Sequence, residues 1–149
     1  MTITARGWIA ASALALSATV ALAASGADAI KERRALMKEN GEATKPIVPM
    51  LKGQAPFDLA TVQKALKTYA NAAEKMPGLF PPDSQTGDTH ALPAIWTDTA
   101  DFDARFKKLG ADSAAALATV TDAASFRATM PNFYKNCGGC HEKYRAKLE

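Results

Sequence analysis

The chain has 149 residues, and 18 basic against 15 acidic side chains give it a formal net charge of +3 at pH 7. This near balance, without any block of basic residues, argues against a nucleic-acid partner. The length and the 48% share of hydrophobic residues allow one domain with a single core.

The N-terminal segment has the pattern of a secretory signal peptide. Arg6 precedes an apolar, alanine-rich run, and an A-x-A cleavage pattern ends at Ala23. The run is too short, and too rich in Ala and Ser, to favour a stable membrane span. We therefore expect residues 1–23 to be removed, which leaves residues 24–149 as one exported domain without a membrane anchor.

The first helical stretch is expected from about Asp28 to Leu51. Pro46 and Pro49 each remove a backbone donor and clash with the preceding turn, so the helix should kink or break between Ala43 and Pro49. Its apolar face recurs at spacings of seven and four residues, through Ile30, Met37, Thr44, Val48 and Leu51.

The second helix is expected to begin after Asp58, whose carboxylate suits an N-cap, and to end at Pro77-Gly78. A loop rich in Pro, Gly and Asp follows, and Pro93 suits the first turn of the third helix. The apolar stripe of the second helix is Val62, Leu66, Tyr69, Ala73 and Met76. The stripe of the third helix is Ile95, Phe102, Phe106, Leu109, Leu117 and Val120.

The fourth helix is expected to start at a cap formed by Thr121 or Asp122 and to run to the C-terminus. Its apolar stripe consists of Phe126, Met130, Phe133, Cys137, Tyr144 and Leu148. No segment has the alternating pattern of a strand. Four amphipathic helices joined by mostly short connections predict an all-α fold, an antiparallel four-helix bundle.

Both cysteines and one of the two histidines fall within five residues near the C-terminus, in the sequence NCGGCHEKYR. On a helix, Cys137, Cys140 and His141 lie on one face. C-x-x-C-H is the attachment signature of haem c, in which two thiols bond to the porphyrin vinyl groups and the histidine is an axial ligand of the iron. We therefore predict one haem c per chain at these three residues.

Three other uses of the cysteine pair fit the sequence less well. A disulfide between such close neighbours would close a tiny loop and stabilise almost nothing. A thioredoxin-like dithiol belongs in a βαβ context, and no such context is visible. A zinc site needs four ligands, and the only other histidine is His90, in the loop before the third helix.

The position of the motif, followed by Tyr144-Arg145, is similar to that of the class II c-type cytochromes, the cytochrome c′ family. The resemblance covers the mature chain, through DAIKERRALM at residues 28–37, GLFPPDS in the second loop, and IWTDTADFDARF at residues 95–106. It implies haem c near the C-terminal end of the fourth helix, a periplasmic location and a homodimer through the first two helices. The two prolines of the first helix depart from the family pattern.

The second axial ligand decides between two functions. Upstream candidates are Met37, Met50, Met76, Met130 and His90. Met130 shares a helix with His141 and cannot reach the opposite face of the haem, whereas Met37 lies on the inward stripe of the first helix. The resemblance implies that Met37 is the distal ligand, as in the low-spin branch of the family. The alternative is that Met37 only fills the core, and that a five-coordinate iron binds nitric oxide or carbon monoxide.

Two further residues are expected near the haem. The matching family position implies that Arg33 neutralises a haem propionate, with a solvated surface arginine as the alternative, and Trp96 is expected in the core against the porphyrin. No distal His–Arg pair for peroxide cleavage is apparent in the sequence, so an enzyme is not expected. The sequence thus predicts a carrier that exchanges single electrons with redox partner proteins.

Overall fold

The computed structural model describes residues 25–148, and the signal peptide expected at residues 1–23 lies outside the described residues. The helices are α1 Gly26–Thr44, α2 Ile47–Leu51, α3 Leu59–Lys75, α4 Ala94–Thr97, α5 Thr99–Thr119, α6 Ala123–Phe133 and α7 Lys135–Tyr144. Two short 3-10 turns, η1 Met76–Leu79 and η2 Pro82–Ser84, lie in the connection between α3 and α4. None of the helices described here is long and apolar enough to span a membrane.

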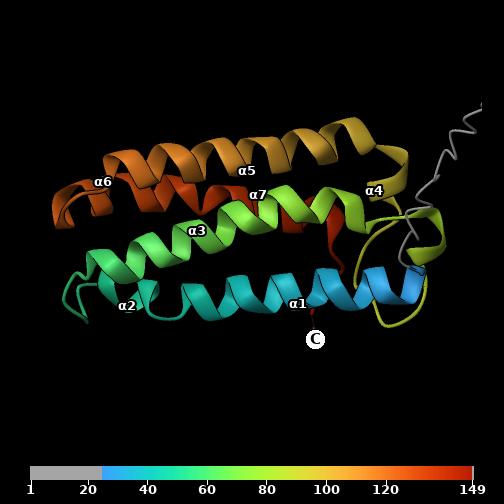
Figure 1. Ribbon diagram of the computed structural model, residues 1–149, viewed down its shortest axis with the longest axis horizontal. Coiled ribbons are helices and arrows are strands. Elements are labelled where there is room, and N and C mark those ends of the chain that lie inside the picture. The colour runs from blue at the N-terminus through green and yellow to red at the C-terminus, as the bar shows by residue number, and fades with distance from the viewer. Residues whose placement is uncertain (1–24, 149) are drawn as a thin grey trace, which may run out of the picture.

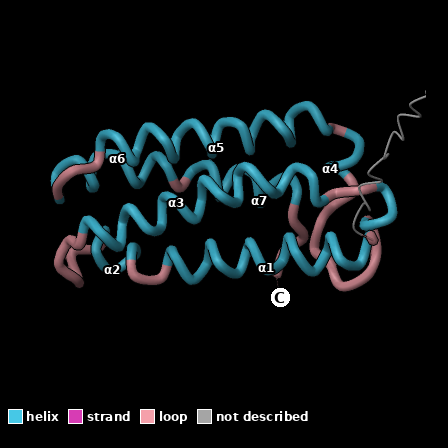
Figure 2. Tube along the Cα trace, in the orientation of Figure 1, coloured by secondary structure: helices cyan, strands magenta, loops and turns pink. Residues whose placement is uncertain are grey.

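The helices form four antiparallel rods, which confirms the expected four-helix bundle (Figure 1). α1 is followed by α2 in the first rod, α4 by α5 in the third and α6 by α7 in the fourth, whereas α3 is a rod by itself. The most extensive contact joins α3 to α5, while α1 packs on α3 and α7 packs on α5. Connections gather at the two ends of the bundle (Figure 2), and the segment after α7 crosses toward α1.

The first rod breaks where the sequence places its prolines. α1 ends at Thr44, and α2 begins directly after Pro46. Pro46 marks the break, because Pro49 lies in the first turn of α2, where a backbone N–H has no helical partner in any case. Gly53 then turns the chain with a φ of 69°, a conformation that favours glycine.

The third and fourth rods are also divided, which their sequence stripes did not indicate. Asp98 leaves helical geometry, with φ −130° and ψ 53°, so α4 is a single turn before α5. Tyr134 separates α6 from α7, shortly after Pro131 removes a backbone donor inside α6. The expectation that the fourth helix reaches the C-terminus is wrong, because α7 ends at Tyr144 and Leu148 is 58% exposed beyond it.

Two helix caps expected from the sequence are present. The Asp58 carboxylate accepts the Thr61 backbone N–H at 3.1 Å. The Asp122 carboxylate accepts the Ser125 backbone N–H at 2.8 Å, and the Ser125 hydroxyl accepts the Asp122 backbone N–H at 3.1 Å, which completes a capping box. The hydrogen bonds from Ser125 hold the pKa of Asp122 below its ordinary value, and the bond from the Ser125 backbone contributes most to this shift.

The core is divided into two clusters at opposite ends of the bundle (Figure 1). We call the first the dense end, and its buried residues are Ile47, Met50, Val62, Ala65, Leu66, Tyr69, Ala116, Val120, Phe126, Met130 and Phe133. We call the second the cavity end, and its buried residues are Leu36, Ala72, Met76, Ile95, Phe102, Phe106 and Tyr144. The cavity end brings α1, α5 and α7 together around the C-x-x-C-H motif.

Candidate functional site

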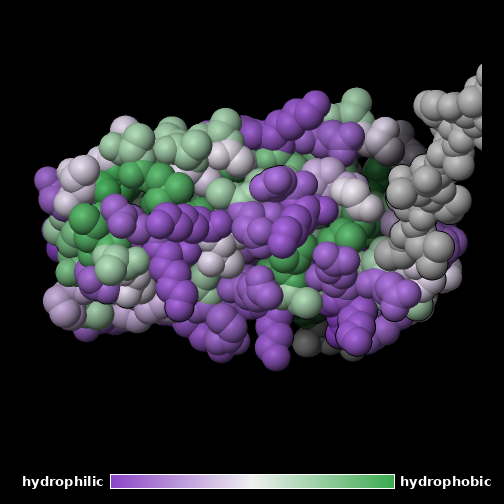
Figure 3. Space-filling view, viewed as in Figure 1, coloured by the Kyte–Doolittle hydropathy of each residue, from purple (hydrophilic) through white to green (hydrophobic). Residues whose placement is uncertain are grey.

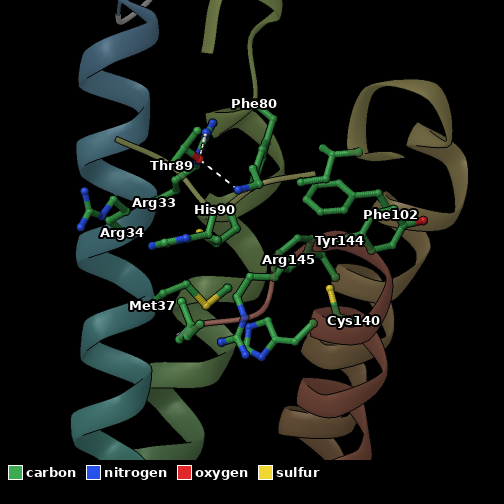
Figure 4. Close-up of a pocket in the computed structure, with 16 residues that line it drawn as sticks. Arg33, Arg34, Met37, Phe80, Thr89, His90, Phe102, Cys140, Tyr144 and Arg145 are labelled. Carbon is green, nitrogen blue, oxygen red and sulfur yellow. Dashed lines mark hydrogen bonds between the residues drawn. The ribbon is translucent and has the colours of Figure 1, made fainter. Parts of the chain in front are cut away.

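Two adjoining cavities form the site. The first has a volume of about 250 Å³ and lies between α1, the connection from α3 to α4, α5 and α7 (Figure 4). The second has a volume of about 450 Å³ and extends from α7 toward α2. Five residues line both cavities: Met37, Phe106, Cys140, His141 and Arg145. Because they share these walls, the cavities are two parts of one site.

α7 presents the motif to this site. Cys137 lines the second cavity, and Cys140 and His141 line both. Both thiols are free and half-buried, and burial raises the pKa of each above its ordinary value. Burial lowers the pKa of His141, and the charge of Arg145 adds to this shift. The neutral imidazole is the form that ligates a metal, so the shift favours the protonation state of His141 that an axial ligand needs.

Met37 faces the site from α1. It lines both cavities, and Figure 4 shows it on the wall opposite Cys140. Met76 and His90 line the first cavity alone. The two other methionines considered from the sequence are buried in the dense end. Met37 is therefore the candidate distal ligand that borders both parts of the site together with His141.

Arg33 is a buried cation in the wall of the first cavity, with 4% of its surface exposed. It donates to the Leu79 carbonyl at 3.0 Å, and to the Ser84 hydroxyl, the Ser84 carbonyl and the Thr89 hydroxyl at 2.8 Å each. Its guanidinium carbon also lies 4.6 Å from the centroid of the Phe80 ring. All these partners are neutral. Burying a charge is costly unless a counter-charge lies nearby, and an anionic group in the cavity would supply one.

Trp96 lies behind this wall. Its indole Nε1 donates to the Phe80 carbonyl at 2.9 Å, and the two rings meet edge to face with centroids 5.9 Å apart. Phe80 lines the first cavity, whereas Trp96 is absent from the lining of both. Trp96 therefore supports the site through Phe80.

Two residues of α5 that the sequence did not single out hold α7. Arg105 donates from Nε to Asp101 at 2.7 Å and from Nη1 to the Gly139 carbonyl, inside the motif, at 3.0 Å. Asp101 also accepts from the Tyr144 hydroxyl at 2.5 Å and from Lys143 Nζ at 3.0 Å. These hydrogen bonds hold the pKa of Asp101 well below its ordinary range, and the bond from Tyr144 contributes most to this shift. Asp101 and Arg105 have the local i,i+4 spacing, but their contacts with α7 span 34 to 43 positions, so no local pattern predicts those contacts.

A chain of hydroxyl groups borders the second cavity. Thr44 and Tyr69 share a hydrogen bond of 2.8 Å, and Tyr69 and Tyr134 share one of 3.0 Å. Burial raises the pKa of both tyrosines, so their hydroxyls remain protonated at neutral pH. Asn40, one turn before Thr44, lines the same cavity, and its buried Oδ1 has no hydrogen-bond partner within residues 25–148.

The lining fits a haem group. Haem is a large, flat and mostly apolar ring that carries two carboxylates, and the site offers aromatic walls, two free thiols, a neutral imidazole and the uncompensated charge of Arg33. By contrast, no three His, Cys, Asp or Glu side chains gather anywhere in residues 25–148 in a way that would hold a bare metal ion. A zinc site therefore has no ligand set in this part of the chain.

Comparisons with known proteins agree with this fit. The family model described as cytochrome c′ matches residues 28–145. A cytochrome c′ of Rhodopseudomonas palustris is 52% identical over 121 residues, which cover 80% of this chain and 83% of the relative. A cytochrome c-556 of Agrobacterium tumefaciens is 38% identical over 119 residues, which cover 79% of this chain and 97% of the relative. A solved structure of the Rhodopseudomonas palustris cytochrome c′ is similar with a TM-score of 0.79 and 51% identity, covering 82% of this chain and 98% of that one.

The chain belongs to the cytochrome c′ family. The class is that of haem-binding electron carriers, and the cofactor is haem c. The family resemblance, the expected cofactor and the four-helix bundle are thereby confirmed. The individual residues that hold the haem, and the ligand on its far side, stay predictions.

Proposed function

We propose that this chain carries single electrons through one haem c attached at Cys137 and Cys140, with His141 and Met37 as axial ligands. When bound, the haem supplies an iron that alternates between Fe(III) and Fe(II). Each thiol would add its S–H across one vinyl group to give a thioether, and the neutral His141 imidazole would offer a ring nitrogen. A methionine opposite this histidine favours the reduced state and raises the potential.

The remaining lining residues hold the cofactor and exclude water. Phe102 and Phe106 provide apolar surface from α5, and Phe80 does so from the connection between α3 and α4. The charge of Arg33, whose other partners are neutral, offsets the negative charge of a propionate. A fixed pair of axial ligands suits electron transfer, because the surroundings of the iron then change little between the two oxidation states.

The position of Met37 is the observation that carries this proposal. It lines both cavities together with Cys140 and His141, from the opposite wall of the site. The second candidate function is a five-coordinate form that binds nitric oxide or carbon monoxide. It is supported by the sequence identities. The chain is 52% identical to a relative named cytochrome c′ but 38% identical to one named cytochrome c-556.

We also propose that the chain is not an enzyme. His90 and Arg34 both line the first cavity, a proximity that the sequence did not reveal. Arg34 is ion-paired with Asp88, however, and Arg33 is held by neutral acceptors. Arg34 is thus engaged by a carboxylate and Arg33 is placed to meet a propionate, so neither guanidinium is positioned to assist His90 in cleaving peroxide.

The test is the substitution Met37→Leu, with Met76→Leu and His90→Ala as matched controls. Leucine keeps the size and apolarity of methionine, so the packing cost should stay below about 1.5 kcal/mol. We expect wild-type protein to show the sharp α band of low-spin iron on reduction and slow carbon monoxide binding. Met37→Leu should shift the iron toward high spin and speed gas binding, and both controls should keep the wild-type absorption spectrum.

Two results would contradict the Met37 assignment. A wild-type protein that is already high-spin and binds carbon monoxide quickly would favour the gas-binding function. A low-spin spectrum that survives Met37→Leu but is lost in Met76→Leu or His90→Ala would place the ligand at that other residue.

We further propose that residues 24–149 form one periplasmic domain after cleavage near Ala23, and that redox partner proteins approach the mouth of the site. Val48 and Leu148 are the large hydrophobic residues exposed within the described part of the chain, at 37% and 58%. Val48 lines the second cavity and Leu148 the first. They give a partner an apolar contact beside the haem.

A homodimer through the first two rods stays a prediction. The face over α1 and α3 is dominated by hydrophilic side chains (Figure 3), and the grooves on it are lined by Lys38, Glu39, Lys64 and Lys67 among others. Two copies that met here would pair charges more than they would bury apolar surface.

A further inference from the structure

α7 is a weak helix by its own sequence. It has ten residues, two glycines at its centre and no side-chain N-cap, and each of these features disfavours a helix in isolation. It nevertheless carries Cys137, Cys140 and His141, whose positions must suit a rigid porphyrin. The order of α7 therefore has to come from its neighbours.

Arg105 and Asp101 of α5, which we call the α5 clamp, supply that order on both sides of His141. Arg105 Nη1 donates to the carbonyl of Gly139, directly before Cys140, at 3.0 Å. Asp101 accepts from the side chains of the second and third residues after His141, at 3.0 and 2.5 Å. The 2.7 Å bond between Arg105 and Asp101 links the two contacts.

We propose that Arg105 and Asp101 are positioning residues of the haem attachment helix, and that Arg105 also places a fixed positive charge beside the haem. The inference rests on the attachment proposed above. Arg105 lines the second cavity with Cys140 and His141, whereas Asp101 lines neither cavity. The positive member of the clamp thus faces the site, and the negative member lies behind it.

Charge and packing make different predictions for this pair. A positive charge beside the haem stabilises Fe(II), because reduction adds one negative charge to the site. Loss of the Arg105 charge should therefore favour Fe(III), and loss of the Asp101 charge should favour Fe(II). If the clamp acted through packing alone, both losses would loosen the same helix and shift the iron in the same direction.

The experiment compares three variants of the holoprotein with a matched control. Arg105→Met keeps length and helix propensity but removes the charge and the bond to Gly139, and Asp101→Asn removes the opposing charge. Arg105→Lys keeps the charge with fewer donors. The control is Lys107→Met, which removes another exposed cation of α5 that forms no ion pair among residues 25–148.

Absorbance gives the Fe(III)/Fe(II) ratio at one fixed solution potential, and hydrogen exchange reports the order of α7. We expect Arg105→Met to raise the ratio about threefold to tenfold and Asp101→Asn to lower it, while Arg105→Lys stays close to wild type. Arg105→Met and Asp101→Asn should both speed amide exchange in α7. Lys107→Met should change neither quantity.

The charge role would be overturned if the ratio moved in the same direction in Arg105→Met and Asp101→Asn. It would also be overturned if the ratio moved no further in these variants than in Lys107→Met. Unchanged exchange in α7 would overturn the positioning role. Attachment is checked separately, because acidified organic solvent should leave the haem on wild-type protein. If the solvent releases the haem, the proposed attachment is wrong. Amide hydrogen exchange in the same variants still decides whether the α5 clamp orders α7.

Discussion

α3 and α5 run through both ends of the bundle, but they meet different surroundings at each end. At the dense end they pack against α2 and α6, where Phe126 is 1% exposed and Met130 is fully buried. At the cavity end they border cavities of about 250 and 450 Å³ and a buried arginine whose hydrogen-bond partners are all neutral. The dense end is a hydrophobic core closed by its own side chains, whereas the side chains of the cavity end line a site for a cofactor.

The comparison shows that an apolar stripe has two different uses in one helical fold. Phe126 and Phe106 both occupy stripe positions and are both buried, at 1% and 4% exposure. Phe126 packs on other side chains of the dense end, but Phe106 lines both cavities. Burial alone therefore does not separate an aromatic residue that packs in the core from one that lines a cavity.

Removal of the haem should cause the largest loss of stability, and the cavity end should lose more of its order than the dense end. The double variant Cys137→Ala, Cys140→Ala should yield haem that solvent extracts, or apoprotein. Losing a tightly bound cofactor should lower the free energy of unfolding by about 4 kcal/mol or more. Hydrogen exchange should become faster around Phe102 and Tyr144 than around Phe126. Equal melting temperatures for the haem-bearing and haem-free forms would contradict this view of the cavity end.

Phe126→Ala should break the dense end and leave the haem site unchanged. A fully buried phenylalanine replaced by alanine should lower the free energy of unfolding by about 3–5 kcal/mol, because it leaves a cavity. Urea denaturation measures this loss, and the α band of the reduced protein should match wild type. Phe106→Ala is the matched variant at the cavity end, and its spectrum should change. Spectral changes of equal size in the two variants would mean that the ends are not independent.

The smallest of the three effects should be the loss of stability at low pH that comes from the N-cap of α6. The pKa of Asp122 is lowered in the folded chain by its bonds from Ser125. Its carboxylate therefore stabilises the fold above the unfolded pKa of about 3.9, and this contribution is lost as the pH falls toward the folded pKa. Asparagine caps a helix without titrating, so Asp122→Asn should flatten the fall of Tm between about pH 5 and pH 3. Identical Tm profiles for both proteins would show that this cap does not couple to pH.

Local signals predicted the features whose partners are close in the chain. Asp58 and Asp122 cap their helices through backbone groups three residues away. Pro46 marks the break in the first rod because proline acts on the turn that precedes it. The C-x-x-C-H motif and the inward position of Met37 also follow from spacings of a few residues.

Long-range contacts account for what the sequence did not reveal. The acceptors of Arg33 lie 46 to 56 positions downstream, and nothing near Arg33 in the sequence distinguishes it from a surface arginine. Asp98, where α4 meets α5, accepts from Lys143 at 2.5 Å across 45 positions. The α5 clamp is hidden for the same reason, because its partners belong to another rod.

The order of the helices along the chain places the attachment helix last in synthesis. Every buried residue of the dense end precedes Tyr134, and the whole C-x-x-C-H motif follows it. The complete set of dense-end residues is therefore synthesised before Cys137. The attachment helix is thus made after α4, α5 and α6, the helices on which it packs.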